Sequence, residues 1–136
     1  NLVAETDGRG HATRFDYDLL NRLVRVVRPP ASDEPGEPVP VATFDYDAMG
    51  NRIAVTDEEG NTTRYQYNSR DQIELVRDAA GGTTSMEFDR VGNVVAIADA
   101  LGQVTRMVYD DLDRLVERTG PDPDGADGPL ESAVTR

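Results

Sequence analysis

Few residues in this chain could do covalent chemistry, and the histidine is the first to consider. His11 is the only histidine among 136 residues, and the sequence contains no cysteine. Any Ser-His-Asp arrangement would depend on His11, and thiolate catalysis and cysteine-ligated zinc have no residue to use. His11 directly follows Gly10, where an exposed turn is expected. We therefore interpret it as a solvated loop histidine, assign no catalytic residue and expect a protein that is not an enzyme.

Pairs of carboxylates one residue apart are the second candidate, because such pairs can converge on a hard cation such as Ca²⁺. They occur at Asp16 and Asp18 and again at Asp45 and Asp47. At the position of Asp16, later segments of the chain carry Gln66, Glu87 and Val108. A periodic metal site would not tolerate that change, so we expect no metal and no other cofactor.

Aromatic side chains form the third candidate, since aromatic faces suit both sugar rings and packed sheets. They recur at Phe15, Tyr17, Phe44, Tyr46, Tyr65, Tyr67, Phe88 and Tyr109. On adjacent strands, side chains of one face lie about 5 Å apart and stabilise each other as cross-strand pairs. A core ladder is the favoured interpretation, and carbohydrate binding stays open as an alternative.

The charge of the chain excludes two kinds of partner. It has 26 acidic against 14 basic residues and a net charge of -12. Such a charge repels phosphate backbones and anionic headgroups, so nucleic acid is not an expected partner. No apolar run approaches the roughly 18 residues that span a bilayer, and we expect no membrane insertion by this segment.

An internal repeat decides the fold. Aromatic-Asp or aromatic-Asn pairs recur every 21 residues, at Tyr46-Asp47, Tyr67-Asn68, Phe88-Asp89 and Tyr109-Asp110, and Tyr17-Asp18 precedes the first of these by 29. The eight extra residues belong to the segment 29–40, PPASDEPGEPVP, whose prolines cannot donate ladder hydrogen bonds. Seven residues before each aromatic anchor stands Gly10, Gly60, Gly81 or Gly102, with Val39 in the unit that carries the insertion. We predict an inserted loop at 29–40.

Each repeat reads as a β-hairpin. Apolar and polar residues alternate up to the anchor, which indicates a half-buried strand. The Asp or Asn after the anchor can close an Asx-turn, and three residues later stand types that tolerate positive φ, namely Asn21, Gly50, Asp71, Gly92 and Asp113. A second strand rich in β-branched residues and Leu is expected at 23–27, 53–56, 73–76, 94–98 and 115–117. Asp57, Asp78 and Asp99 each begin a D-x-x-G link into the next repeat.

These observations predict an all-β chain of tandem antiparallel hairpins that form a continuous, curved sheet, as a fragment of something larger. The repeat array spans 1–120, with a partial repeat at 1–9 and repeats that begin near 10, 39, 60, 81 and 102. Residues 121–136 are expected to hold an inter-repeat loop and the start of a truncated repeat.

The assembled unit, G-x3-R-x-Y-x-Y-D-x-x-G-R-L, resembles the YD repeat of bacterial Rhs proteins, of teneurins and of the C component of insecticidal Tc toxins. The best instances are TRFDYDLLNRLVRV at 13–26, TFDYDAMGNRIAVTD at 43–57 and YDDLDRLVE at 109–117. Asn68 for Asp, Phe88 for Tyr, and Asp71 or Asp113 for Gly are departures from the family pattern. The signature positions, to which we assign a structural role only, are Gly10, Arg14, Tyr17, Asp18, Tyr46, Asp47, Gly50, Gly60, Arg64, Tyr67, Asn68, Gly81, Phe88, Asp89, Gly92, Gly102, Arg106, Tyr109 and Asp110.

The resemblance implies a non-catalytic structural segment of a hollow shell that encloses or presents a C-terminal toxin or effector of a secreted or surface-exposed bacterial protein. The implied partners are flanking repeats and the enclosed effector of the same polypeptide. The alternative is an extended surface adhesion module that binds carbohydrate or a cell-surface protein. The self-cleaving core of the family has no convincing match. Asp122-Pro123-Asp124-Gly125 shares a D-P-x-G string with that core, but its place at the next link favours a loop.

Overall fold

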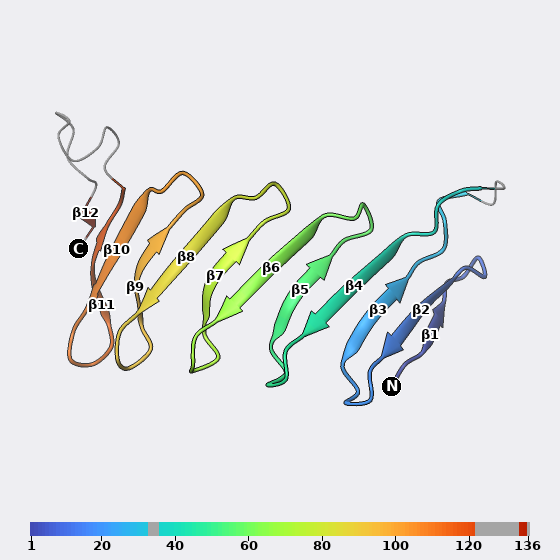
Figure 1. Ribbon diagram of the computed structural model, residues 1–136, viewed down its shortest axis with the longest axis horizontal. Coiled ribbons are helices and arrows are strands. Elements are labelled where there is room, and N and C mark those ends of the chain that lie inside the picture. Colours follow the sequence, from blue (N-terminus) through green and yellow to red (C-terminus); the bar gives the residue numbers. More distant parts are fainter. Residues whose placement is uncertain (33–35, 122–133, 136) are drawn as a thin grey trace. The chain divides into compact units, whose positions relative to one another are not determined.

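The computed structural model describes residues 1–32, 36–121 and 134–135, and all regular structure within them is β-strand (Figure 1). Within these residues, no helix is long and apolar enough to span a membrane. The chain divides into two units, Asn1–Tyr65 and Gln66–Arg136. In each unit, every strand pairs antiparallel with the strand that follows it in the sequence. This arrangement confirms the all-β prediction of tandem hairpins.

The first unit contains six consecutive strands, the last of which ends in the second unit. They are β1 (Ala4–Thr6), β2 (Ala12–Tyr17), β3 (Leu23–Val27), β4 (Val41–Tyr46), β5 (Arg52–Thr56) and β6 (Thr62–Tyr67). The hairpin β2–β3 pairs Phe15 with Val26 and Asp16 with Arg25, and the next hairpin repeats this register in β4 and β5. Each repeat therefore contributes one hairpin, as the 21-residue period predicts.

The second unit continues the same pattern. Its strands are β7 (Ile73–Arg77), β8 (Thr83–Phe88), β9 (Val94–Ala98), β10 (Val104–Tyr109), β11 (Leu115–Thr119) and β12 (Val134–Thr135). The predicted bounds of β3 and β9 coincide with the observed ones. β11 continues to Thr119 instead of ending at Glu117, because it pairs with β10 on one side and with β12 on the other.

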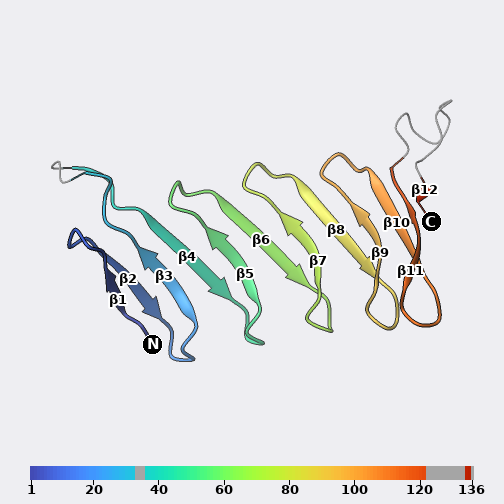
Figure 2. The same ribbon diagram turned by 180° about the vertical axis from the view of Figure 1, so that it is seen from behind.

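The inserted segment between β3 and β4 lies outside any strand. The backbone N–H of Arg28 donates to the carbonyl of Pro40 at 3.0 Å, and the ladder resumes with the pair Val27 and Val41. Figure 2 shows this segment leaving the first unit at the ends of β3 and β4. The mobility of this loop stays a prediction. The D-P-x-G string at 122–125 and most of the final loop lie outside the described residues.

The strand register gives each unit two different sheet faces. On the aromatic face, directly paired residues include Phe15, Val26 and Ala42 in the first unit and Met86, Ile97 and Thr105 in the second. On the charged face they include Asp45, Ala54 and Arg64, and likewise Glu87, Ala96 and Arg106.

The core is thin on both faces. Among the described residues, only Val26, Ala54 and Ala96 are buried, at 9, 7 and 5% exposure. The two alanines lie on the charged face, where a longer side chain flanks each of them on either side. Long charged side chains cover small neighbours in this way. The anchor aromatics are half-buried, which agrees with the alternation read from the sequence.

Candidate functional site

The turn that follows each aromatic anchor, here called the anchor turn, is the most regular feature of the chain. The backbone N–H of Asp18 donates to the carbonyl of Arg22, and that of Asn21 donates to the carbonyl of Asp18, both at 3.0 Å. The carboxylate Oδ1 of Asp18 accepts the N–H groups of Leu20 at 2.8 Å and Arg22 at 2.9 Å. The same carboxylate or amide bonds recur at Asp47, Asn68, Asp89 and Asp110. The predicted Asx-turn is confirmed.

The fourth residue of each anchor turn has positive φ, as the sequence predicts. φ is 61° at Asn21, 59° at Asp71, 58° at Asp113, 98° at Gly50 and 107° at Gly92. This backbone conformation is easy for glycine and tolerable for Asn and Asp. The departures from glycine at these positions are therefore compatible with the same turn.

The link turns between repeats use the same geometry, which the sequence reading did not identify. At Asp57, the N–H donates to the carbonyl of Asn61 at 2.9 Å, and Oδ1 accepts the N–H groups of Glu59 and Asn61. Equivalent backbone bonds occur at Asp7, Asp78 and Asp99. The available signal was the position of these aspartates, 10 or 11 residues from the next turn Asp or Asn. One five-residue motif therefore closes both ends of the hairpins.

The anchor tyrosine bonds one repeat to the one before it. The hydroxyl of Tyr46 donates to the carbonyl of Leu23 at 2.9 Å, and the hydroxyl of Tyr109 donates to the carbonyl of Val94 at 3.0 Å. Each acceptor is the first residue of the second strand of the preceding hairpin. Phe88 has the ring without the hydroxyl and cannot make this bond. The Tyr-Asp pair thus combines an inter-repeat bond with an intra-repeat turn.

The residue four positions after the turn Asp or Asn contacts the next anchor turn, and Arg22 does so most completely. Its Nε donates to Asp18 Oδ2 at 2.7 Å, its NH1 donates to the carbonyl of Asp47 at 3.1 Å, and its guanidinium lies 4.7 Å from the ring centroid of Tyr46. At the same turn position, Gln72 donates to the carbonyl of Gly92 at 3.2 Å and Asn93 to Asp113 Oδ1 at 3.0 Å. We call these residues, Arg22, Gln72 and Asn93, the clasp residues.

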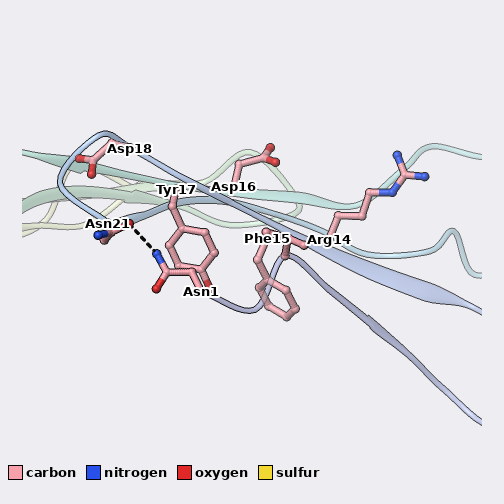
Figure 3. Close-up of a pocket in the computed structure, with 8 residues that line it drawn as sticks. Asn1, Arg14, Phe15, Asp16, Tyr17, Asp18 and Asn21 are labelled. Carbon is pink, nitrogen blue, oxygen red and sulfur yellow. Dashed lines mark hydrogen bonds between the residues drawn. The ribbon is translucent and has the colours of Figure 1, made fainter.

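The shallow hollow beside β2 is the best candidate for a ligand site on the aromatic face of the first unit. It has a volume of about 450 Å³, and its lining includes Asn1, Val3, Phe15, Tyr17 and Asn21. Figure 3 shows the two aromatic rings on one side of the strand, with Arg14 and Asp16 directed to the other side. Asn1 Nδ2 donates to Asn21 Oδ1 at 3.0 Å, which uses part of the polar lining.

Three other aromatic rings of the first unit lie beside arginine side chains. Besides Arg22 at Tyr46, the guanidinium of Arg52 lies 5.9 Å from the ring centroid of Phe44 and 6.0 Å from that of Tyr65. A guanidinium stacked on a ring occupies the surface that a sugar would use. This arrangement favours the packing interpretation of these aromatics over carbohydrate binding.

The candidate catalytic and metal residues are placed in turns and in ion pairs. His11 is exposed, and its Nδ1 lies 3.6 Å from Asp7 Oδ2. Asp16 pairs with Arg25 at 3.1 Å, and Asp18 closes its turn. Among the described residues, no group of three or more His, Cys, Asp or Glu side chains could hold a metal ion. The paired acids therefore serve structural contacts wherever their bonds are defined.

Turn hydrogen bonds lower the pKa of six aspartates. The pKa of Asp18 lies below the usual 3.8 chiefly because the N–H of Arg22 donates to the carboxylate, and that of Asp110 chiefly because the Arg114 side chain does. At Asp47 and Asp89, partial burial is the largest influence and raises the pKa, but hydrogen bonds from their turns outweigh it. The pKa is also lowered at Asp7 and Asp57. These turns therefore favour the ionised carboxylate.

The remaining signature residues lie at two kinds of position. Gly10, Gly60, Gly81 and Gly102 end the link turns with φ of 88, 85, 92 and 78°. Arg14, Arg64 and Arg106 are exposed on the charged face. Tyr17 and Tyr67 end β2 and β6. These placements agree with a structural role for the signature positions, which stays our proposal.

Comparison with known proteins gives both a family and a fold. Residues 1–30, 46–83 and 88–125 match the family described as RHS Repeat, which is more than half of the chain. No match was found among curated proteins.

Similar solved structures include the pore form of the Photorhabdus luminescens Tc holotoxin, with a TM-score of 0.71, 20% identity and 88% of this chain covered. The TcdB2-TccC3-Cdc42 structure has a TM-score of 0.72 with 18% identity over 98% of the chain. The TcdB2-TccC3 structure has a TM-score of 0.71 with 21% identity over 88%. This chain spans only 6, 8 and 6% of the chains in those three structures, and the likeness shows the fold alone. From the match to the repeat family, the chain belongs to the RHS repeat family.

Proposed function

We propose that this chain is a non-catalytic segment of a shell wall that encloses or presents a toxin or effector located C-terminal to it in the same bacterial polypeptide. The observation that carries the proposal is that neighbouring repeats are bonded to each other at every level of the hairpin. Ladder hydrogen bonds, the anchor hydroxyls and the clasp residues all join one repeat to the next within each unit. A wall needs such continuity, whereas a catalytic site needs a polar cluster that breaks the repeat.

The similar structures support this proposal by analogy. They are Tc toxin components, and one of them is described with Cdc42 in its name. By the same analogy we propose that the protein is secreted or lies on the bacterial surface, and that its partners are the flanking repeats and the enclosed effector.

The test uses the full-length protein that contains this segment, treated with a nonspecific protease under native conditions. We expect the polypeptide C-terminal to the repeats to survive longer than it does when expressed alone. A variant with Tyr46→Phe, Tyr109→Phe and Arg22→Ala, which loosens contacts between repeats, should shorten that survival. Equal digestion of the C-terminal polypeptide with and without the repeats would contradict the proposal.

The adhesion alternative can be tested on the chain itself with a glycan array. We expect no glycan-dependent signal, since arginine side chains lie on aromatic rings of the first unit. A signal that a Tyr65→Ala, Tyr67→Ala double variant abolishes would favour adhesion instead.

A further inference from the structure

The tips of the anchor turns carry exposed aliphatic side chains. Residue Asp18 + 2 is Leu20, and the equivalent positions hold Met49, Val91 and Leu112, with exposures of 69, 79, 71 and 71%. Leu19, at the neighbouring tip position, is 102% exposed. The turn does not require these residues, because the turn at Asn68 has the same hydrogen bonds with Ser69 and Arg70 at its tip.

The link turns of the first unit provide an internal contrast. Their tips are Gly8 and Arg9 in one turn and Glu58 and Glu59 in the other. Since both kinds of turn share one backbone geometry, the difference in side chains is not explained by folding of the turn. Scattered exposed aliphatic residues are ordinary, but one class of turn that carries them in four repeats out of five indicates a contact surface.

In the first unit, Leu19, Leu20 and Met49 form this surface, here called the apolar turn edge. Both turns join the end of a first strand to the start of a second strand, so they lie at the same end of the hairpins (Figure 1). Neighbouring strands are about 4.8 Å apart, so equivalent turns recur about every 10 Å. A partner that contacts all the tips together must present apolar groups at that same spacing.

The link turns of the second unit present such a surface. Their tips are Ala79 and Ala80 in one turn and Ala100 and Leu101 in the next, and all four residues are exposed, Leu101 at 83%. They recur with the spacing of the repeat, because they belong to the same kind of hairpin. The acidic tips Glu58 and Glu59 of the first unit fit an apolar partner poorly.

We propose that the apolar turn edge of the first unit docks onto the link turns 78–81 and 99–102 of another row of the same repeats, so that rows of hairpins join turn to turn. In isolated chains, a second copy of this chain supplies that row. This inference deepens the proposed wall function, on which it rests, by assigning the surface through which neighbouring rows of the wall meet.

Site-directed cross-linking can test the contact cleanly, because the sequence has no cysteine. Chains with Met49→Cys are mixed with chains with Leu101→Cys and oxidised. The matched control replaces Leu101→Cys by Glu59→Cys, which lies at the same position of a link turn with acidic tips. We expect the Met49–Leu101 disulfide dimer to form roughly tenfold faster than the control dimer, a difference of about 1.4 kcal/mol in contact free energy. Equal rates for the two mixtures would overturn the proposal.

Sedimentation velocity gives a second, independent readout. We expect concentration-dependent association of the unmodified chain, and a Leu20→Ser, Met49→Ser double variant should raise its dissociation constant roughly tenfold. Val108→Ser, at a residue 52% exposed on a strand, is the control and should leave association unchanged. Association that the turn variant does not weaken would instead indicate pairing through open strand edges, and a chain that stays monomeric would also contradict the docking contact.

Failure of this inference is distinguishable from failure of the proposed function. Protection of the C-terminal polypeptide in the full-length protein, without the Met49–Leu101 cross-link, would retain the wall function and exclude this contact. The cross-link without protection would retain the contact and exclude enclosure.

Discussion

Removal of the Arg22 side chain offers the sharpest test of the bonds between repeats. The guanidinium donates to the Asp47 carbonyl and lies on the Tyr46 ring, and both groups belong to the next repeat. A hydrogen bond from a charged group contributes about 1.5 kcal/mol, and an accessible cation–π contact about 0.5 kcal/mol. The ion pair with Asp18 is screened by solvent and is counted as zero. Arg22→Ala should therefore lower the free energy of unfolding by about 2 kcal/mol.

Urea denaturation followed by circular dichroism measures this loss, and two variants serve as controls. Arg22→Gln keeps an amide donor at a position where Gln72 makes the same inter-repeat bond, so it should recover part of the loss. Arg25→Ala removes an ion pair with Asp16 whose side chains are 47 and 54% exposed, and it should change stability by at most about 0.5 kcal/mol. Equal effects of Arg22→Ala and Arg25→Ala would refute the assignment of Arg22 as a clasp between repeats.

Three further predictions follow from the turns and anchors. Gly50→Ala should cost about 1 kcal/mol in urea unfolding from backbone strain alone, because φ is 98° and an added Cβ would meet no atom within 4 Å. Tyr109→Phe should cost about 1 kcal/mol by removing the bond to the Val94 carbonyl, and Phe88→Tyr should recover a similar amount if its hydroxyl reaches the preceding repeat. Thermal midpoints should be constant from about pH 7 to pH 5 and fall below about pH 4. The turn aspartates have folded pKa values below the usual 3.8, so their contribution is present above 3.8 and is lost as pH falls through the lowered values; Asp18→Asn should flatten that fall.

The sequence predicted the fold closely because the information it used is local. Alternation before Tyr17 indicates one strand, and Asp18 and Asn21 determine the turn through bonds within five residues. A 21-residue period then repeats the result along the chain. The second strand at 94–98 was placed correctly for the same reason, since its β-branched residues directly follow a turn with recognisable chemistry.

The contacts between repeats were not predicted, because they join residues far apart in the sequence. Arg22 meets the Asp47 carbonyl across 25 residues, and Tyr46 meets the Leu23 carbonyl across 23. Neither the type of residue nor the period indicates which carbonyl a hydroxyl reaches. That choice depends on the register of neighbouring hairpins, which only the folded sheet defines.

The insertion at 29–40 shows how the ladder accommodates a change in one link turn. Arg28 replaces the turn Asp, yet its N–H donates to the Pro40 carbonyl at 3.0 Å, as the N–H of Asp57 donates to the Asn61 carbonyl at 2.9 Å. The hairpin is therefore closed below the loop. Replacing residues 28–39 by the tetrapeptide of residues 57–60 should preserve the pairing of Arg25 with Thr43.

That replacement shortens the segment between the bonded residues from eleven to three. Loop-closure entropy favours the shorter loop by about 1 kcal/mol, so the shortened chain should be more stable by about that amount in urea unfolding. Hydrogen exchange of the unmodified chain should show little backbone protection across 29–40, since its prolines cannot donate ladder bonds. A shortened chain that is less stable, or strong protection within the loop, would mean that the insertion packs against the sheet and contributes to its folding.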